Sequence, residues 1–360
     1  MRCILLLAIA LSSLASPLQA CTCFFVANDS VALFARNYDW ALERGMLIVN
    51  KRGVAKQAFS FDRPASWESR YGSITFNQYG REFPNDGMNE AGLVVAVMWL
   101  DTSKYPEPDE RPSMGSAQWV QYQLDTAATV DDVLASDNQI RISSAGGGMV
   151  HYLVADASGN AAVIEWIDGK RVVHTGESLV AAALTNSTYE RSVDYLRRHQ
   201  EFGGDRPIPA TGSSLDRFVR AASTVAKGVD DAAWDAEKSY AGLANVAQGS
   251  RTQWSIVYDV KNRAVEFRTQ SAPAIKSLSM ASLDLSTDSP VKVLPIATTG
   301  AGDVASRLKD YDTEQNLAEI NAAFDATFFL RAWPALLREK IARYPEQMCR
   351  PSPLPTGVGN

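Results

Sequence analysis

The sequence predicts an α+β protein whose strands and helices occupy separate stretches of the chain. Short apolar runs rich in β-branched residues recur between residues 22 and 185, and helical spacing of apolar residues dominates residues 189–246. Two more strand-like runs follow, and the C-terminal region is again helical. Strands, then helices, then strands, then helices is the order expected of a layered α+β domain.

The first strands are expected to form a hairpin. Residues 24–27 and 31–35 are apolar runs, and the turn residues Asn-Asp-Ser at 28–30 separate them. Another apolar run covers residues 46–50. Residues 92–100 (GLVVAVMWL) lack polar side chains and are rich in β-branched ones, which indicates a buried strand.

The remaining elements are predicted from turns and periodicity. Turn residues divide residues 149–175 into a three-stranded meander, and residues 180–185 are expected to form another strand. The rest of the chain is predicted to contain helices at 189–202, 215–226 and 230–246, strands at 254–260 and 264–269, and a helical region at 314–344 that Pro334 interrupts.

Residues 1–20 have the pattern of a secretory leader. An arginine stands near the start, residues 3–11 are an unbroken apolar run, and the small residue Ala20 precedes Cys21. The apolar run is shorter than the roughly 20 residues that a membrane-spanning helix needs, and no later segment of the sequence is long and apolar enough. We therefore expect cleavage after Ala20 and a secreted or periplasmic protein. No linker-like stretch divides residues 21–360, so a single domain is predicted.

Composition excludes several classes of partner and site. The formal net charge is −6 and the sequence has no basic cluster, so nucleic acid is not an expected partner. The three histidines, His151, His174 and His199, do not have metal-ligand spacing. The sequence also lacks the phosphate-loop, dinucleotide-binding and serine-hydrolase fingerprints. No metal and no cofactor is expected, and His151 and His174 are interpreted as structural residues on strands.

Removal of the leader would leave three cysteines, Cys21, Cys23 and Cys349. An odd number of cysteines in an exported protein indicates that at least one thiol stays free. A disulfide between Cys23 and Cys349 is the pairing that spares Cys21. The sequence leaves this pairing open.

Cleavage after Ala20 would give Cys21 two reactive groups, a thiol and a primary α-amine. Their ordinary pKa values are about 8.5 and about 7.7 to 8.0, so the amine can take the thiol proton near neutral pH. The second predicted strand continues into Arg36 and Asp39, and hairpin pairing would bring both close to Cys21. A nearby positive charge favours a thiolate. A carboxylate can orient an amine that acts as a base.

A second interpretation of the same junction is a bacterial lipoprotein. Residues 18–21 (Leu-Gln-Ala-Cys) also resemble a lipoprotein cleavage box, in which the cysteine carries a lipid. Gln19 is an unusual residue for that box. A lipid-anchored binding or structural protein with Cys21 as its anchor is therefore the alternative from a different functional class.

Five short motifs follow one another along the chain. They are Cys-Thr at 21–22, Ala-Arg-Asn-Tyr-Asp-Trp at 35–40, Asn-Glu-Ala-Gly-Leu at 89–93, Thr-Asn-Ser at 185–187 and Ser-Leu-Asp-Arg-Phe-Val-Arg at 214–220. In this order they resemble the motifs of the choloylglycine hydrolase and penicillin V acylase family of N-terminal-nucleophile hydrolases. The resemblance covers most of the mature chain, to about residue 269. It implies a four-layer αββα fold and hydrolysis of a linear amide C–N bond.

The resemblance also implies a role for each matched polar residue. Cys21 would be the nucleophile and, through its amine, the general base. Arg36 would lie beside the thiolate, Asp39 would hold the amine, and Arg217 would lie behind the cysteine. The side-chain amide of Asn186 would donate to the oxyanion that forms during the reaction.

The backbone N–H of Trp99 would be the second donor to that oxyanion. Trp99 and Trp40 stand where other members of the family have different residues, which favours an acyl pocket lined by aromatic side chains. Small-molecule amides such as penicillin V or N-acyl homoserine lactones are then the expected substrates, and conjugated bile salts are the alternative. The interval from Asn186 to Arg217 is shorter than in many bile-salt hydrolases. Because that region supplies a subunit-assembly loop in the family, a homo-oligomer stays an open alternative.

Overall fold

The structure is a computed structural model that describes residues 21–60, 62–144 and 148–351. The predicted leader at residues 1–20, with its cleavage after Ala20, lies outside the described residues. Among the described residues, no helix combines the length and the apolar character needed to cross a bilayer.

Two large β-sheets form the centre of the molecule. The first has seven strands in the order β14-β1-β2-β15-β16-β17-β19, and the second has nine in the order β13-β12-β11-β8-β7-β6-β3-β18-β20. The strands of the first sheet are β1 (Thr22–Ala27), β2 (Ala32–Asp39), β14 (Ala183–Leu184), β15 (Thr252–Asp259), β16 (Ala264–Thr269), β17 (Lys276–Ser279) and β19 (Gly302–Asp303). Those of the second are β3 (Met46–Asn50), β6 (Ser73–Asn77), β7 (Asp86–Asn89), β8 (Val94–Trp99), β11 (Val150–Ala155), β12 (Ala161–Ile167), β13 (Lys170–Thr175), β18 (Lys292–Pro295) and β20 (Lys309–Asp310).

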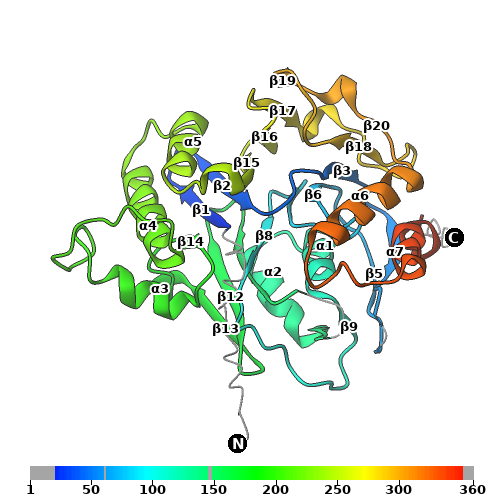
Figure 1. Cartoon of the computed structure of the whole chain (residues 1–360), viewed down its shortest axis with the longest axis horizontal. Helices are drawn as coiled ribbons and strands as arrows, with labels where there is room; N and C mark the ends of the chain where they lie inside the picture. Colours follow the sequence, from blue (N-terminus) through cyan, green and yellow to red (C-terminus); the bar gives the residue numbers. More distant parts are fainter. Residues whose placement is uncertain (1–20, 61, 145–147, 352–360) are drawn as a thin grey trace, which may run out of the picture.

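Helices cover the outer face of each sheet. Helices α3 (Tyr189–Leu196), α4 (Ser214–Asp230) and α5 (Ala236–Asn245) lie on the side of the first sheet (Figure 1). On the other side, α1 (Ser116–Thr126) packs against β7 and β8, and α2 (Val130–Ala135) joins the same apolar core. The order helix, sheet, sheet, helix is the αββα arrangement, so the predicted fold class is confirmed.

Strand β8 shows why the run at residues 92–100 is apolar at nearly every position. Val94, Ala96 and Met98 belong to the core that also contains Phe24 of the first sheet. The intervening Val95 packs in the core formed with α1. Successive side chains of a strand point to opposite faces, so a strand covered on both faces needs apolar residues throughout.

Three predicted elements are shorter than their sequence patterns indicate. The helix predicted at 189–202 ends at Leu196, since the chain turns from Arg197 onward. The helix predicted at 230–246 begins at Ala236, because the side chain of Asp235 accepts from the backbone N–H of Lys238 and caps the helix. The strand predicted at 180–185 pairs as β14 only over Ala183–Leu184.

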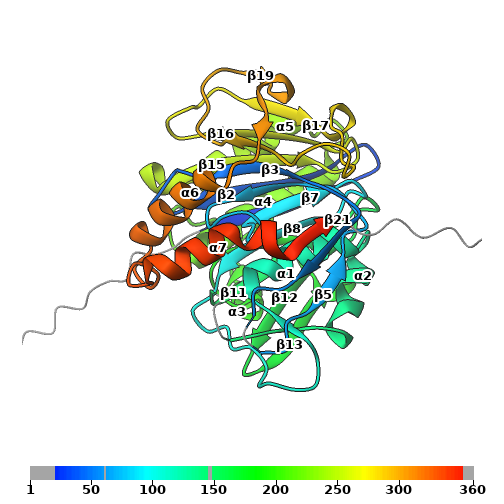
Figure 2. The ribbon, with the colours of Figure 1, turned by 90° about the vertical axis from the view of Figure 1, so that its right-hand side faces the viewer.

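The C-terminal part forms a pair of helices, α6 (Thr313–Ala326) and α7 (Ala335–Met348), which lie side by side (Figure 2). Pro334 immediately precedes α7, so the predicted break is confirmed. The chain then continues into β21 (Cys349–Pro351), which pairs with β4 (Val54–Gln57), and β4 pairs with β5 (Ser66–Glu68).

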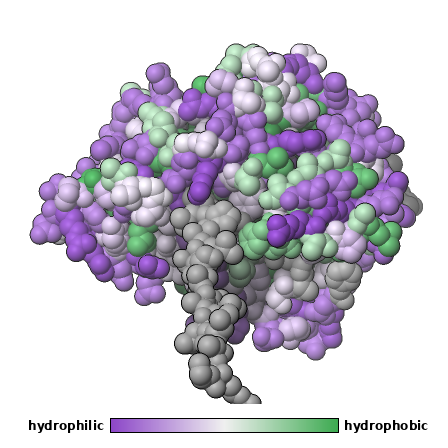
Figure 3. Space-filling model, in the orientation of Figure 1, coloured by the Kyte–Doolittle hydropathy of each residue, from purple (hydrophilic) through white to green (hydrophobic). Residues whose placement is uncertain are grey.

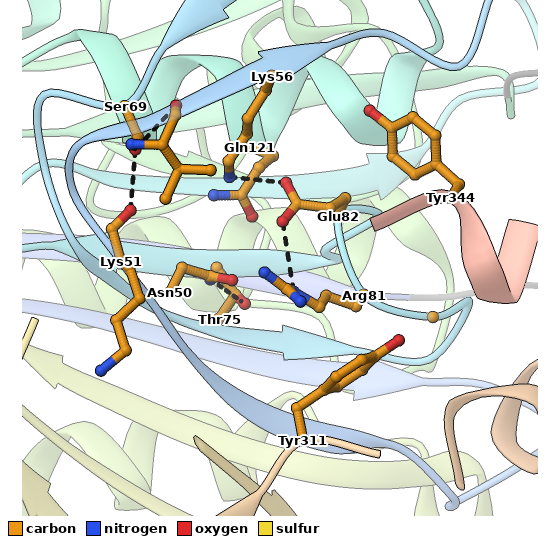
Figure 4. A network of polar contacts seen from close by, with 12 residues as sticks. Asn50, Lys51, Lys56, Ser69, Thr75, Arg81, Glu82, Gln121, Tyr311 and Tyr344 are labelled. Carbon is orange, nitrogen blue, oxygen red and sulfur yellow. Dashed lines mark hydrogen bonds and ion pairs between the residues drawn. The ribbon is translucent and has the colours of Figure 1, made fainter. Parts of the chain in front are cut away.

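A buried ion network fastens this small sheet to the rest of the molecule. The Nζ atom of Lys56, on β4, lies 2.7 Å from Oε2 of Glu82 and 3.0 Å from Oδ2 of Asp125 on α1. Figure 4 shows Lys56 and Glu82 with Arg81 on the other side of the glutamate. Because β21 follows α7 directly, the network also fixes the position of the C-terminal helices.

The disulfide that the sequence left open between Cys23 and Cys349 does not form. Both cysteines, like Cys21, are free thiols. Cys23 lies in the core between the sheets, with its Sγ 3.4 Å from Sδ of Met98. Cys349 lies opposite Lys56 in the small sheet. The two cysteines therefore belong to different parts of the fold.

Candidate active site

The hairpin of β1 and β2 places Cys21 beside the end of β2. Thr22 pairs with Asn37 and Cys23 pairs with Arg36, as the turn at residues 28–30 predicted. Cys21 is buried, with 3% of its surface exposed, and its Sγ lies 4.0 Å from the backbone oxygen of Asp39. The structure thus brings three predicted site residues, Cys21, Arg36 and Asp39, to one corner of the first sheet.

Arg36 extends from the first sheet into the second. Its Nη1 donates to the backbone oxygen of Asn85 at 2.6 Å, and its Nη2 donates to that of Val97 at 2.8 Å. Nη1 also forms a fully buried ion pair with Asp86, which accepts a further hydrogen bond from Tyr258. Sequence reasoning missed Asp86. Its neighbours Asn85 and Gly87 are residues typical of turns, so no local pattern in the sequence marks Asp86 as buried or as a partner of Arg36.

The Cys21 thiol is not a pre-formed thiolate. Burial raises its pKa above the ordinary value, and the charge of Arg36 lowers it by less than burial raises it. A thiol in this environment keeps its proton until a base removes it. Any nucleophilic role for Cys21 therefore requires a base next to it.

Asp39 is a buried carboxylate with one unsatisfied oxygen. Its Oδ1 accepts from the hydroxyl of Thr252 at 2.5 Å, whereas Oδ2 has no hydrogen-bond partner among the described residues. Burial raises the pKa of Asp39 to about 6, although Thr252, Arg217 and Arg36 act in the opposite direction. A buried acceptor without a donor is costly, so Oδ2 is free to accept a hydrogen bond from a donor that the described residues do not supply.

Arg217 lies in the first turn of α4, where the hydroxyl of Ser213 caps the helix. Its Nη1 donates to the backbone oxygen of Cys21 at 2.7 Å, and its Nη2 donates to Oδ1 of Asn186 at 2.9 Å. One guanidinium therefore links the cysteine to the loop that carries Asn186. The predicted position of Arg217 behind Cys21 agrees with this geometry.

Asn186 and Trp99 face each other across the site. The Nδ2 of Asn186 donates to the backbone oxygen of Trp99 at 2.9 Å, and the backbone N–H of Asn186 donates to Oγ of Ser214. The N–H and C=O of one residue in a strand point to the same edge, so the N–H of Trp99 lies on the edge that Asn186 approaches. An amide nitrogen has two hydrogens, and the contact with Trp99 uses one of them.

A cavity of about 310 Å³ opens beside Cys21. Trp40 and Trp99 both line it, as expected, and their rings lie 6.5 Å apart. The cavity is mainly apolar, and several of its aromatic residues were not predicted. These are Tyr38, Phe59, Tyr79, Phe83, Phe324, Phe329 and Trp333.

The C-terminal helices α6 and α7 and the loop between them supply one wall of this cavity. Phe324, Phe329, Leu330, Trp333 and Ile341 line it, and the ring of Phe329 lies 5.4 Å from that of Trp99. Apolar surface residues gather around α6 on the same side of the molecule (Figure 3). The periodicity of residues 314–344 predicted helices there, and nothing in that pattern indicated that the helices reach the site.

The layered fold, with a buried cysteine at the head of its first strand, is the fold of the N-terminal-nucleophile hydrolases. The chain belongs to the choloylglycine hydrolase family of linear amide C–N hydrolases, whose model matches residues 21–293. Among curated proteins, penicillin V acylase from Pectobacterium atrosepticum is 33% identical over 226 residues, which cover 56% of this chain. The match spans 58% of that relative, a little over half its length.

Two solved structures have the same fold. The structure of penicillin V acylase from Agrobacterium tumefaciens superposes with a TM-score of 0.71 at 28% identity, covering 81% of this chain and 98% of that chain. A variant of conjugated bile acid hydrolase from Clostridium perfringens gives a TM-score of 0.66 at 19% identity, covering 77% and 98%. The second likeness is one of fold alone.

Proposed function

We propose that the chain is an exported amidase that hydrolyses a linear amide with an apolar or aromatic acyl group, using Cys21 as its nucleophile. The observation that carries the proposal is the buried, unpartnered Oδ2 of Asp39 beside Cys21. Removal of residues 1–20 would convert the amide nitrogen of Cys21 into a primary amine. That amine is the donor that Oδ2 lacks.

The same cleavage creates the base that the thiol needs. The α-amine takes the proton from Sγ, and the charge of Arg36 stabilises the resulting thiolate. The thiolate attacks the amide carbon, and the Nδ2 of Asn186 and the N–H of Trp99 stabilise the oxyanion. The ammonium group then gives its proton to the leaving amine, and the acyl group stays on sulfur as a thioester. Water, deprotonated by the amine, attacks the thioester, the carboxylic acid leaves, and the ammonium proton returns to the sulfur of Cys21.

The cavity supports the choice of acyl group. Its aromatic walls suit a phenoxyacetyl or fatty acyl group better than a polar one. Penicillin V and N-acyl homoserine lactones are therefore the first substrates to test, and the relatives named as penicillin V acylases support that order. Conjugated bile salts serve as the comparison substrate. The likeness to bile acid hydrolase is one of fold alone, so it gives no reason to expect that they are preferred.

The test is hydrolysis of penicillin V, N-acyl homoserine lactones of several chain lengths and glycocholate by the mature protein and by Cys21→Ser. We expect hydrolysis of at least one of the first two classes and near-complete loss in Cys21→Ser. Unchanged hydrolysis in Cys21→Ser would refute the nucleophilic role. A diacylglycerol adduct on Cys21 in the intact mass would instead support the lipid-anchored alternative.

A further inference from the structure

His151 is a buried histidine that the proposed reaction does not use. It lies on β11, where Leu153 two residues later faces the core between the sheets, so the His151 side chain points toward the first sheet. Its Nδ1 lies 2.7 Å from Oε1 of Glu165 on β12, and its Nε2 lies 2.8 Å from the backbone oxygen of Thr185. All of the His151 surface is buried. Thr185 directly precedes Asn186.

Both neighbours of the imidazole are hydrogen-bond acceptors. The oxygen of Thr185 is a carbonyl, and the carboxylate of Glu165 already accepts from the backbone N–H of Tyr189, at 3.0 Å to Oε1 and 3.1 Å to Oε2. A neutral imidazole has a single N–H and cannot donate to both neighbours. The His151–Glu165 pair must therefore hold one proton more than a neutral histidine and a carboxylate hold together.

The pair holds both ends of the segment that carries Asn186. His151 binds the carbonyl of Thr185 before it, and Glu165 binds the N–H of Tyr189 after it. Both contacts connect the segment to the second sheet, which also contains Trp99. The position of the Asn186 amide relative to Trp99 thus depends on this pair, and displacing a reacting group by 1 Å can cost about 100-fold in rate.

We propose that His151 and Glu165 are positioning residues, whose hydrogen bonds to Thr185 and Tyr189 hold the Thr185–Asn186 turn so that the Asn186 amide faces the reacting carbonyl. The proposal rests on the proposed function, because it gives Asn186 a role in the reaction. Neither residue lines the cavity beside Cys21. Their effect is therefore expected in kcat rather than in KM.

Glu165→Gln keeps the hydrogen bonds of the pair and removes its extra proton. The glutamine amide can donate to Nδ1 of a neutral His151 while its oxygen accepts from Tyr189, and Nε2–H still donates to Thr185. We expect kcat of Glu165→Gln within about threefold of the parent enzyme. His151→Ala and Glu165→Leu remove hydrogen bonds that hold residues 185–189. We expect kcat to fall about 10- to 100-fold in each variant, with little change in KM. His199→Ala is the control, since its ring packs on Tyr195 and its Nδ1 bonds to the backbone oxygen of that residue, outside residues 185–189.

Hydrogen exchange of residues 185–189 provides a readout that does not depend on activity. Faster exchange in His151→Ala and Glu165→Leu, and protection in Glu165→Gln, is the expected pattern. Unchanged kcat in His151→Ala, while Cys21→Ser and Asn186→Ala are inactive, would overturn the positioning role and leave the proposed function intact. Equal losses in Glu165→Gln and Glu165→Leu would also overturn it. If Cys21→Ser still hydrolyses the amide substrates, the proposed function is wrong. The exchange pattern would then still test whether His151 and Glu165 hold residues 185–189.

Discussion

Arg217 donates through Nη2 to the side-chain oxygen of Asn186 at 2.9 Å, and this bond fixes the orientation of the Asn186 amide. With Oδ1 held by a guanidinium, the NH2 group must point the other way, toward Trp99. The same guanidinium donates to the backbone oxygen of Cys21. The proposed nucleophile and the proposed oxyanion donor are therefore held by a single side chain.

Replacing Asn186 should act on the chemical step. We expect Asn186→Ala to lower kcat about 100- to 1,000-fold with a smaller effect on KM, because it removes one oxyanion donor. Asn186→Asp should be equally inactive, since it keeps the acceptor for Arg217 and loses the donor. Steady-state kinetics on the best substrate measure both effects. Asn262→Ala, on an exposed turn, is the control, and a comparable loss there would remove the special role of Asn186.

The acid side of the pH profile should depend on Thr252. The carboxylate of Asp39, with a pKa raised to about 6, must be ionised to hold the amine. Activity is then expected to fall as the pH drops below that value, because the neighbouring charged amine also favours the ionised carboxylate. Thr252→Val removes a hydrogen bond that stabilises the carboxylate, so it raises the pKa further and shifts the fall to higher pH. Thr252→Ser keeps the hydroxyl and should keep the parent profile of kcat/KM against pH. Identical profiles for Thr252→Val and the parent would contradict this role of Asp39.

The wall formed by the C-terminal helices and the loop between them should set acyl selectivity. Leu330→Trp reduces the cavity, and we expect kcat/KM for the longest acyl groups to fall at least about 10-fold more than for the shortest. Trp333→Ala enlarges the cavity and should shift the preference the other way. A series of homologous amides with one leaving group measures the effect. Leu336→Trp, on an exposed position of α7, should leave the series unchanged. The same profile in all three variants would exclude this wall from the acyl site.

The ion pair of Arg36 with Asp86 should stabilise the fold as well as the site. Both side chains are fully buried, so Asp86→Ala leaves an uncompensated charge and is expected to lower the free energy of unfolding by about 3 to 5 kcal/mol. The exposed pair of Lys292 with Asp310 is the control, and Asp310→Ala should cost less than about 1 kcal/mol. Urea unfolding followed by circular dichroism measures both. Equal losses of unfolding free energy in Asp86→Ala and Asp310→Ala would show that burial does not set the strength of these ion pairs.

Local patterns in the sequence predicted much of the fold and part of the site. The turn at residues 28–30 predicted the β1–β2 hairpin, and its register brings Arg36 and Asp39 to Cys21. The motif around Arg217 begins a helix in the structure. These predictions are correct because each feature depends on neighbours within one hairpin or one helical turn.

Features that depend on distant segments were not predictable in this way. Thr252 reaches Asp39 because β15 pairs with β2, and the two residues are 213 positions apart. Asp86 meets Arg36 only through the stacking of two sheets. His151 was interpreted as structural because a lone histidine has no spacing that indicates a partner. Its contacts with Glu165 and Thr185 come from two other segments.

The central claim is that Cys21 carries the acyl group during turnover. The most direct measurement is the intact mass of the mature protein, quenched with acid during hydrolysis of a slow substrate. We predict the mass of residues 21–360 with a free amine, plus a second species heavier by one acyl group, which is absent in Cys21→Ser. Turnover without an acyl adduct on the peptide that begins at Cys21, or a lipid adduct on that residue, would contradict the account.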